Sequence, residues 1–79
     1  MTQAITLSAQ LARILTARRR ALKLSQKTVA AKLGISQNRL SEIEANPGRL
    51  SLQRLLDIAN ILDLELVLQD RKPVPEGDW

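Results

Sequence analysis

The residues of this chain that could do chemistry are mainly basic, and they gather in one part of it. Residues 1–54 contain ten Lys and Arg against two acidic residues, a net charge of +8, whereas residues 55–79 carry two basic and six acidic residues, a net charge of −4. Clustered basic residues neutralise phosphate groups, so the first part suits nucleic acid and the acidic end is expected to face something else. The alternative is ordinary solvating surface charge.

Catalysis is not supported by the composition. The chain has no His and no Cys, and its carboxylates are scattered singly. No acid–base pair, no nucleophile with its base and no thiolate metal site can be assembled from them, and no glycine-rich phosphate loop is present. We therefore expect no enzyme activity, no cofactor and no metal. Neither a signal peptide nor a membrane span is indicated, so we expect a cytoplasmic, nucleoid-associated bacterial protein.

Two short helices are expected within the basic part of the chain, over residues 26–33 and 37–45. Their apolar residues recur at a spacing that places them on inward faces: Val29, Leu33, Leu40 and Ile43. Ala30 is small where the helices cross, and Gly34 can take the positive φ of a tight turn. Ser25 and Ser36 are suitable N-caps. This pattern predicts a helix-turn-helix that binds DNA, with a plain helical hairpin as the alternative.

Two further helices are expected to close the core, one over residues 8–23 and one over residues 52–62, the second capped by Ser51. A loop, residues 46–49, precedes that cap. The inward residues expected on these two helices are Leu11, Ile14, Leu15, Leu22, Leu55, Leu56, Ile58, Ala59 and Leu62.

Residues 64–69, the sequence LELVLQ, alternate as in a half-covered strand: Leu64, Glu65, Leu66, Val67, Leu68 and Gln69. No second strand is expected in the chain, so the simplest partner is the same segment of a second copy, paired antiparallel about a two-fold axis. This predicts a homodimer. The alternatives are a longer fourth helix or a fifth helix.

The fold class predicted is therefore mostly α: a repressor-like domain of four to five helices, residues 1–69, with one C-terminal strand pairing across a homodimer. Residues 70–79 contain two Pro and one Gly and are expected to form a flexible tail. Trp79, the only aromatic residue, could anchor a pocket on a partner protein, or could be a chance terminal residue.

The run SQKTVAAKLGISQNRLSEIE resembles the helix-turn-helix of the Cro/CI-type repressor superfamily, the xenobiotic-response-element family, and the resemblance covers residues 18–62. Its marks are Gln26 opening the second helix, Ala30 at the fifth position, Gly34 at the ninth and Glu44 ending the third helix. The segment EANPGRLSLQRLLDIANILDLELVLQD, with the proline-bearing tail that ends in Trp, is similar to HipB-type antitoxins.

The superfamily resemblance implies roles for individual residues. Base contacts in the major groove are implied for Ser36, Gln37, Asn38, Arg39 and Ser41, with Gln37 and Asn38 the strongest candidates. Contacts to the DNA backbone are implied for Gln26, Lys27, Lys32, Arg49 and Arg54. Glu42 could accept from a cytosine or be held away from DNA. Arg19 is implied to pair with Glu44 as a structural ion pair, whereas Arg18 and Arg20 could face solvent or phosphate.

The HipB likeness implies a dimer that represses its own operon at palindromic double-stranded operator DNA and binds a HipA-type serine/threonine kinase toxin, with Trp79 as a candidate toxin contact. A stand-alone repressor without a toxin is the main alternative. A helical protein-interaction module that no longer binds DNA is the third, and the basic residues around positions 36–41 argue against it.

Overall fold

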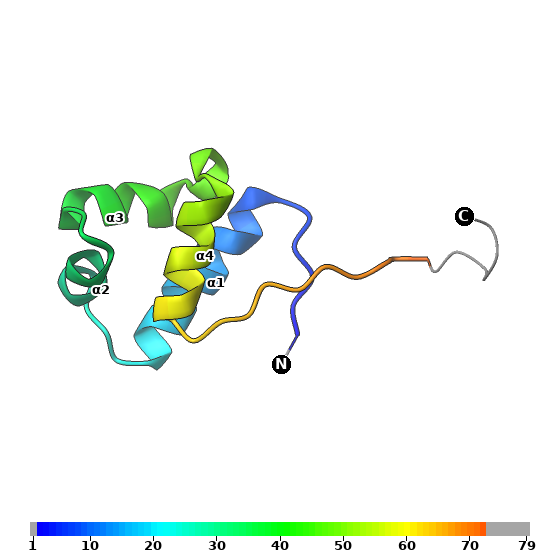
Figure 1. Ribbon diagram of the computed structural model, residues 1–79, viewed down its shortest axis with the longest axis horizontal. Helices are drawn as coiled ribbons and strands as arrows, with labels where there is room; N and C mark the ends of the chain where they lie inside the picture. Colours follow the sequence, from blue (N-terminus) through cyan, green and yellow to red (C-terminus); the bar gives the residue numbers. More distant parts are fainter. Residues whose placement is uncertain (1, 73–79) are drawn as a thin grey trace.

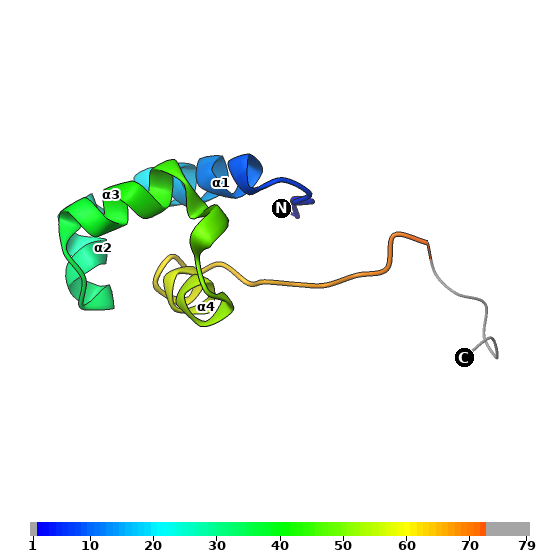
Figure 2. The same ribbon diagram turned by 90° about the horizontal axis from the view of Figure 1, so that it is seen from above.

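The computed structural model describes residues 2–72, which form four α-helices and one short 3-10 helix. The helices are α1 (Ser8–Ala21), α2 (Gln26–Leu33), α3 (Gln37–Ala45) and α4 (Leu52–Ile61), and the 3-10 helix η1 (Pro47–Arg49) joins the last two. Helices α2 and α3 lie together at one end of the molecule, and the segment after α4 runs away from them (Figure 1, Figure 2). The bounds predicted for α2 and α3 are confirmed, and α4 ends one residue earlier than expected.

Three of the helices begin in the same way, on a serine. The side chains of Ser25, Ser36 and Ser51 each accept a hydrogen bond from the backbone N–H three residues later, at 3.0, 3.1 and 3.1 Å. Each cap satisfies one of the N–H groups that a helix leaves without an internal partner. All three caps were expected from the sequence.

Three helices are also followed, one or two residues after their ends, by a residue with positive φ. Gly34 has φ 72°, as expected, but Lys23 and Asp63 also have positive φ, at 58° and 54°. After α1 and α4, the N–H of the residue with positive φ and the N–H of the residue after it donate to carbonyls of the last helical turn. This is the pattern of a Schellman motif. The residue that follows is apolar each time and packs against the core: Leu24, Ile35 and Leu64.

This ending corrects the expectation that α1 runs to Lys23. The helix ends at Ala21 because Lys23 turns out of the helical conformation, so Leu24 and not Leu22 returns to the core. Leu22 is 37% exposed, and its placement in the core was wrong.

The core is one cluster drawn from all four helices. Its buried members are Leu15, Val29, Ala30, Leu40, Ile43, Ile58 and Leu62. Ala30 is 2% exposed at the crossing of α2 and α3, as its small size predicts. Leu55 and Leu56 are only half-buried. A core this small stabilises a chain of 79 residues only modestly, so polar contacts between the helices have a large share in fixing their arrangement.

No strand is present within residues 2–72, so the expected strand at residues 64–69 is not seen in this single chain. The helical alternatives are also wrong, because α4 ends at Ile61 and the residues after it are not helical. The segment is extended in outline (Figure 2), and Leu66, Val67 and Leu68 are 43%, 61% and 94% exposed. A strand needs a neighbour for its backbone groups, and one copy of this chain does not supply it.

No helix within residues 2–72 has the length and apolar character needed to cross a membrane.

Candidate nucleic-acid interface

The polar face of α3 is the surface best suited to reach base edges. Leu40 and Ile43 are buried at 1% and 4% exposure, which fixes the inward side of the helix. With 100° between successive residues, Asn38, Ser41 and Glu42 fall on the opposite side, and Gln37 and Arg39 lie at its two edges. All five residues are exposed. Hydrogen-bonding side chains therefore cover the outer surface of the first turns of α3.

Three residues at the start of α3, Ser36, Arg39 and Glu42, are already engaged within the chain. The hydroxyl of Ser36 accepts from the N–H of Arg39 at 3.1 Å, so Ser36 positions the start of the helix and keeps its O–H donor and one acceptor lone pair. The Nη1 of Arg39 donates to Oε2 of Glu42 at 3.2 Å, an exposed pair that DNA could easily displace. Gln37, Asn38 and Ser41, which the sequence also marked for base contact, are likewise exposed.

A largely buried ion pair holds the far end of α3 against α1. The Nε and Nη2 of Arg19 donate to Oε2 and Oε1 of Glu44 at 2.7 and 3.2 Å, and the two side chains are 11% and 10% exposed. A third donor of the same guanidinium, Nη1, reaches the carbonyl of Leu24 at 2.9 Å. This is the contact that the superfamily resemblance implies for Arg19 and Glu44, and it engages Arg19 between α1 and α3 and away from the exposed face of α3.

Gln26 joins this ion pair. Its Nε2 donates to Oε1 of Glu44 at 3.0 Å, which ties the start of α2 to the end of α3. A primary amide carries two N–H donors, so this bond leaves one for a phosphate oxygen. The N-terminus of α2 adds its own partial positive charge there. The phosphate contact expected for Gln26 is compatible with the bond to Glu44.

The residues expected to contact the DNA backbone differ in exposure and in their contacts within the chain. Lys27 and Lys32 are exposed on α2. Arg49 shares a hollow of about 250 Å³ with Arg39 beside the end of α3, lined also by Glu42, Ile43, Asn46 and Leu50. Arg54 differs, because its half-buried guanidinium donates to the carbonyl of Leu33 at 3.4 Å, at the end of α2. That bond gives Arg54 a role within the fold.

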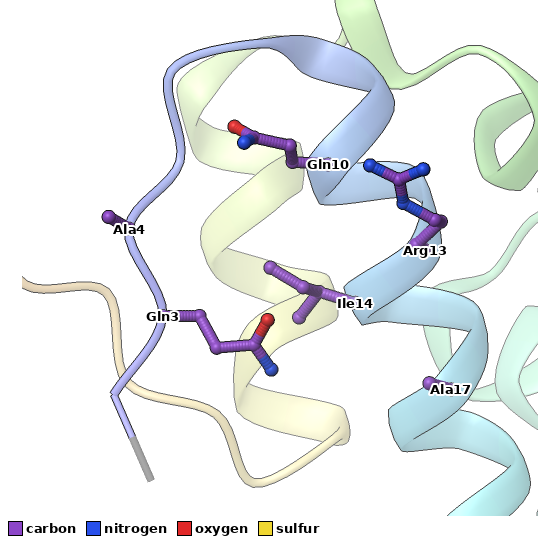
Figure 3. Close-up of a pocket in the computed structure, with 6 residues that line it drawn as sticks. All are labelled: Gln3, Ala4, Gln10, Arg13, Ile14 and Ala17. Atoms are coloured by element: carbon purple, nitrogen blue, oxygen red, sulfur yellow. The ribbon is translucent and has the colours of Figure 1, made fainter.

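A second hollow, of about 330 Å³, lies between the N-terminal segment and α1 (Figure 3). Gln3 and Ile14 point into it, and Gln10, Arg13 and Ala17 complete most of its lining. It contains none of the residues expected to contact DNA. Among residues 2–72 no group of His, Cys, Asp or Glu is arranged to hold a metal ion.

Arg18 was missed as a structural residue. Its Nε donates to the carbonyl of Leu62 at 2.8 Å and its Nη2 to that of Asp63 at 3.2 Å, so its guanidinium is engaged within the fold. The sequence held no clear signal for this contact, because the acceptors are backbone atoms 44 and 45 residues away.

Comparison with known proteins decides the family. The helix-turn-helix family model matches residues 14–69, the part that holds α2, α3 and α4. The chain belongs to the helix-turn-helix family. The Cro/CI-type resemblance found in the sequence is thereby confirmed, and the family is one of DNA-binding transcriptional regulators that are not enzymes.

Individual relatives of this helix-turn-helix protein narrow the likeness. An uncharacterized HTH-type transcriptional regulator, y4dL, of Sinorhizobium fredii (strain NBRC 101917 / NGR234) is 41% identical over 61 residues, 77% of this chain and 31% of that protein. The chain thus matches less than a third of that relative's length.

Solved structures add a likeness over most of the chain. A chain of a HipA–HipB–O2–O3 complex superposes with a TM-score of 0.80 at 32% identity, covering 90% of this chain and 100% of that one. A chain of a HipB–O4 20mer complex superposes with a TM-score of 0.79 at the same identity and coverage. The fold is therefore similar to that of HipB antitoxin structures.

Replacing Glu44 by Gln should destabilise the fold, because it leaves the guanidinium of Arg19 buried without a counter-charge. We expect the free energy of unfolding to fall by about 3 kcal/mol. Urea denaturation followed by circular dichroism measures it. Glu42→Gln on the same helix is the matched control, since its pair with Arg39 is exposed and should contribute less than about 0.5 kcal/mol. Equal losses in the two variants would contradict the structural role of Glu44.

Proposed function

We propose that this protein is the DNA-binding antitoxin of a type II toxin–antitoxin system, which represses its own operon and neutralises a HipA-type serine/threonine kinase by direct binding. The observation that carries the DNA-binding part is the exposed polar face of α3, rigidly held by the buried pair of Arg19 and Glu44. The likeness to a chain of the HipA–HipB–O2–O3 complex supports the antitoxin part.

The division of labour within the interface follows from exposure and charge. Gln37, Asn38 and Ser41 read base edges from the major groove, since amide and hydroxyl groups discriminate base pairs by donor and acceptor pattern. Lys27, Lys32 and Arg49 contact phosphates, with Gln26 at the start of α2. Arg39 lies at the edge beside Arg49, so it serves a base or a phosphate depending on how deeply α3 enters the groove.

The protein acts as a homodimer in this proposal. Residues 64–69 leave the body extended, and within residues 2–72 no backbone hydrogen bond engages any residue after Leu64. Leu66, Val67 and Leu68 are 43%, 61% and 94% exposed, so this segment presents three consecutive apolar side chains, and a contiguous exposed apolar stretch is typical of an interface. Antiparallel pairing with a second copy satisfies the backbone and covers the leucines together, and it matches a palindromic operator by two-fold symmetry.

Trp79, the proposed toxin contact, lies outside the described residues, and its role rests on the sequence alone. It is the only aromatic side chain of the chain, and Trp is enriched among the residues that dominate binding energy at interfaces. A stand-alone repressor is the second candidate, because the relative from Sinorhizobium fredii is described as an HTH-type transcriptional regulator.

Replacing Asn38 by Ala should weaken binding to the operator about tenfold or more while leaving binding to random DNA nearly unchanged, because a base contact is lost and no phosphate contact is. Selection from random-sequence DNA identifies the palindrome, and fluorescence anisotropy at fixed salt measures both affinities. Asn60→Ala, an exposed amide on α4, is the control and should change neither. Equal weakening on both DNAs would assign Asn38 to the backbone.

Replacing Leu66 by Pro should shift the protein from dimer to monomer, because proline removes a backbone N–H and cannot take part fully in a strand ladder. Sedimentation equilibrium measures the association. Leu66→Val keeps the N–H and a strand-favouring side chain, so it should remain dimeric. A dimer that withstands the proline would place the interface elsewhere.

A tagged chain purified from its native host should retain a kinase-like protein, identified by mass spectrometry. The matched sample is the chain truncated after Lys72, which keeps every residue of the described structure. Loss of the kinase on truncation would assign the contact to residues 73–79, and retention by both would move it to the helical body. Recovery of operator DNA without any kinase from either sample would favour the stand-alone repressor.

A further inference from the structure

The end of α4 is held by a side chain from α1. Arg18 donates from Nε to the carbonyl of Leu62 at 2.8 Å and from Nη2 to the carbonyl of Asp63 at 3.2 Å. These are carbonyls at the end of the helix, where a positive charge is favoured by the helix dipole and by the unpaired acceptors. The ends of α1 and α4 lie side by side there (Figure 1).

The carboxylate of Asp63 contributes little to this contact. It lies 3.7 Å from Nη2 of Arg18, and its side chain is 95% exposed, so water and salt screen the attraction. The backbone carbonyls are the closer acceptors. The guanidinium suits them because its rigid fork can serve two acceptors at once.

The same place is where the chain leaves the helical body. Asp63 has φ 54°, the N–H of Leu64 bonds back to the carbonyl of Ala59 at 2.8 Å, and Leu64 packs against the core. Residues 65–72 have no helix or strand and are exposed. Arg18 and the packed Leu64 therefore determine together the direction in which residues 65–69 depart.

We propose that Arg18 is a positioning residue that sets the angle between the helical body and the dimerising segment, and thereby the separation of the two α3 helices that the dimer presents to DNA. The inference rests on the proposed function, because it requires pairing through residues 64–69. Two-fold symmetry doubles the effect, since a tilt in one subunit is repeated in its partner. Half-sites lie about 34 Å apart, one helical turn, and one base pair is about 3.4 Å, so a small tilt changes which spacing fits.

The test measures spacing preference directly. The palindrome that the intact chain selects is rebuilt with one or two base pairs inserted or removed between its half-sites, and a single half-site serves as the reference. The intact chain should prefer one spacing about tenfold over its neighbours, on the scale of one mismatched contact. Arg18→Gln should reduce that preference to about threefold or less while binding the single half-site as the intact chain does.

Two controls isolate the carbonyl contact. Arg20→Gln removes the same charge from the same turn of α1 at an exposed position and should keep the tenfold preference. Asp63→Asn removes the carboxylate and leaves both carbonyls in place, so it should also keep the preference. Arg18→Lys retains the charge without the fork and should lose the preference, which provides a second variant if Arg18→Gln does not fold.

A second readout needs no DNA. The chain has no Cys, so a single Ala31→Cys substitution, at an exposed position of α2, allows one spin label to be attached to each subunit. The distance distribution between the two labels should be narrow in the intact dimer and in Arg20→Gln, and broad in Arg18→Gln. Unchanged spacing preference and unchanged width in the Arg18 variants would overturn the inference while leaving the dimeric repressor intact. No preference for two half-sites over one in the intact chain would overturn both.

Discussion

The carboxylate of Glu44 connects three helices through one buried group. It receives two bonds from Arg19 on α1 and one from Gln26 on α2, and it belongs to α3 itself. With so few side chains fully buried, apolar packing alone leaves the angle between α2 and α3 weakly determined, whereas a planar guanidinium facing a carboxylate has a preferred geometry. A buried ion pair adds little net stability, since desolvation opposes the attraction. Its contribution here is to fix the position of the start of α2 relative to α3.

Arginines of one helix thus do two different tasks. Arg19 turns toward the DNA-binding helices and Arg18 toward the end of α4, because successive residues of a helix point about 100° apart. Together they make α1 the element that relates the surface that reads DNA to the segment proposed to join two subunits. In the proposed dimer, α1 therefore governs how the two α3 helices are presented to DNA.

Much of this arrangement follows from local sequence. The bounds of α2 and α3, the three serine caps and the positive φ of Gly34 could be predicted because each depends on residues within one turn. The ends of α1 and α4 were harder, since Lys23 and Asp63 take the positive φ that usually marks glycine. The apolar residue after each, Leu24 or Leu64, is the available signal, because it returns to the core only if the chain turns there. Arg18 could not be assigned because its acceptors are distant backbone atoms. The strand expected at residues 64–69 is not seen because one copy of the chain supplies no neighbouring strand.

The exposed segment after Leu64 also affects how repression would depend on protein concentration. Pairing of two such segments is bimolecular, so the fraction of dimer rises with total protein, and a regulator that binds two half-sites together follows that fraction. A newly made copy with Leu68 in water would therefore be a weak repressor until enough copies accumulate. Repression would then rise with protein concentration more steeply than binding to a single site does. The extended segment would thus make the degree of repression depend on how much of the protein is present.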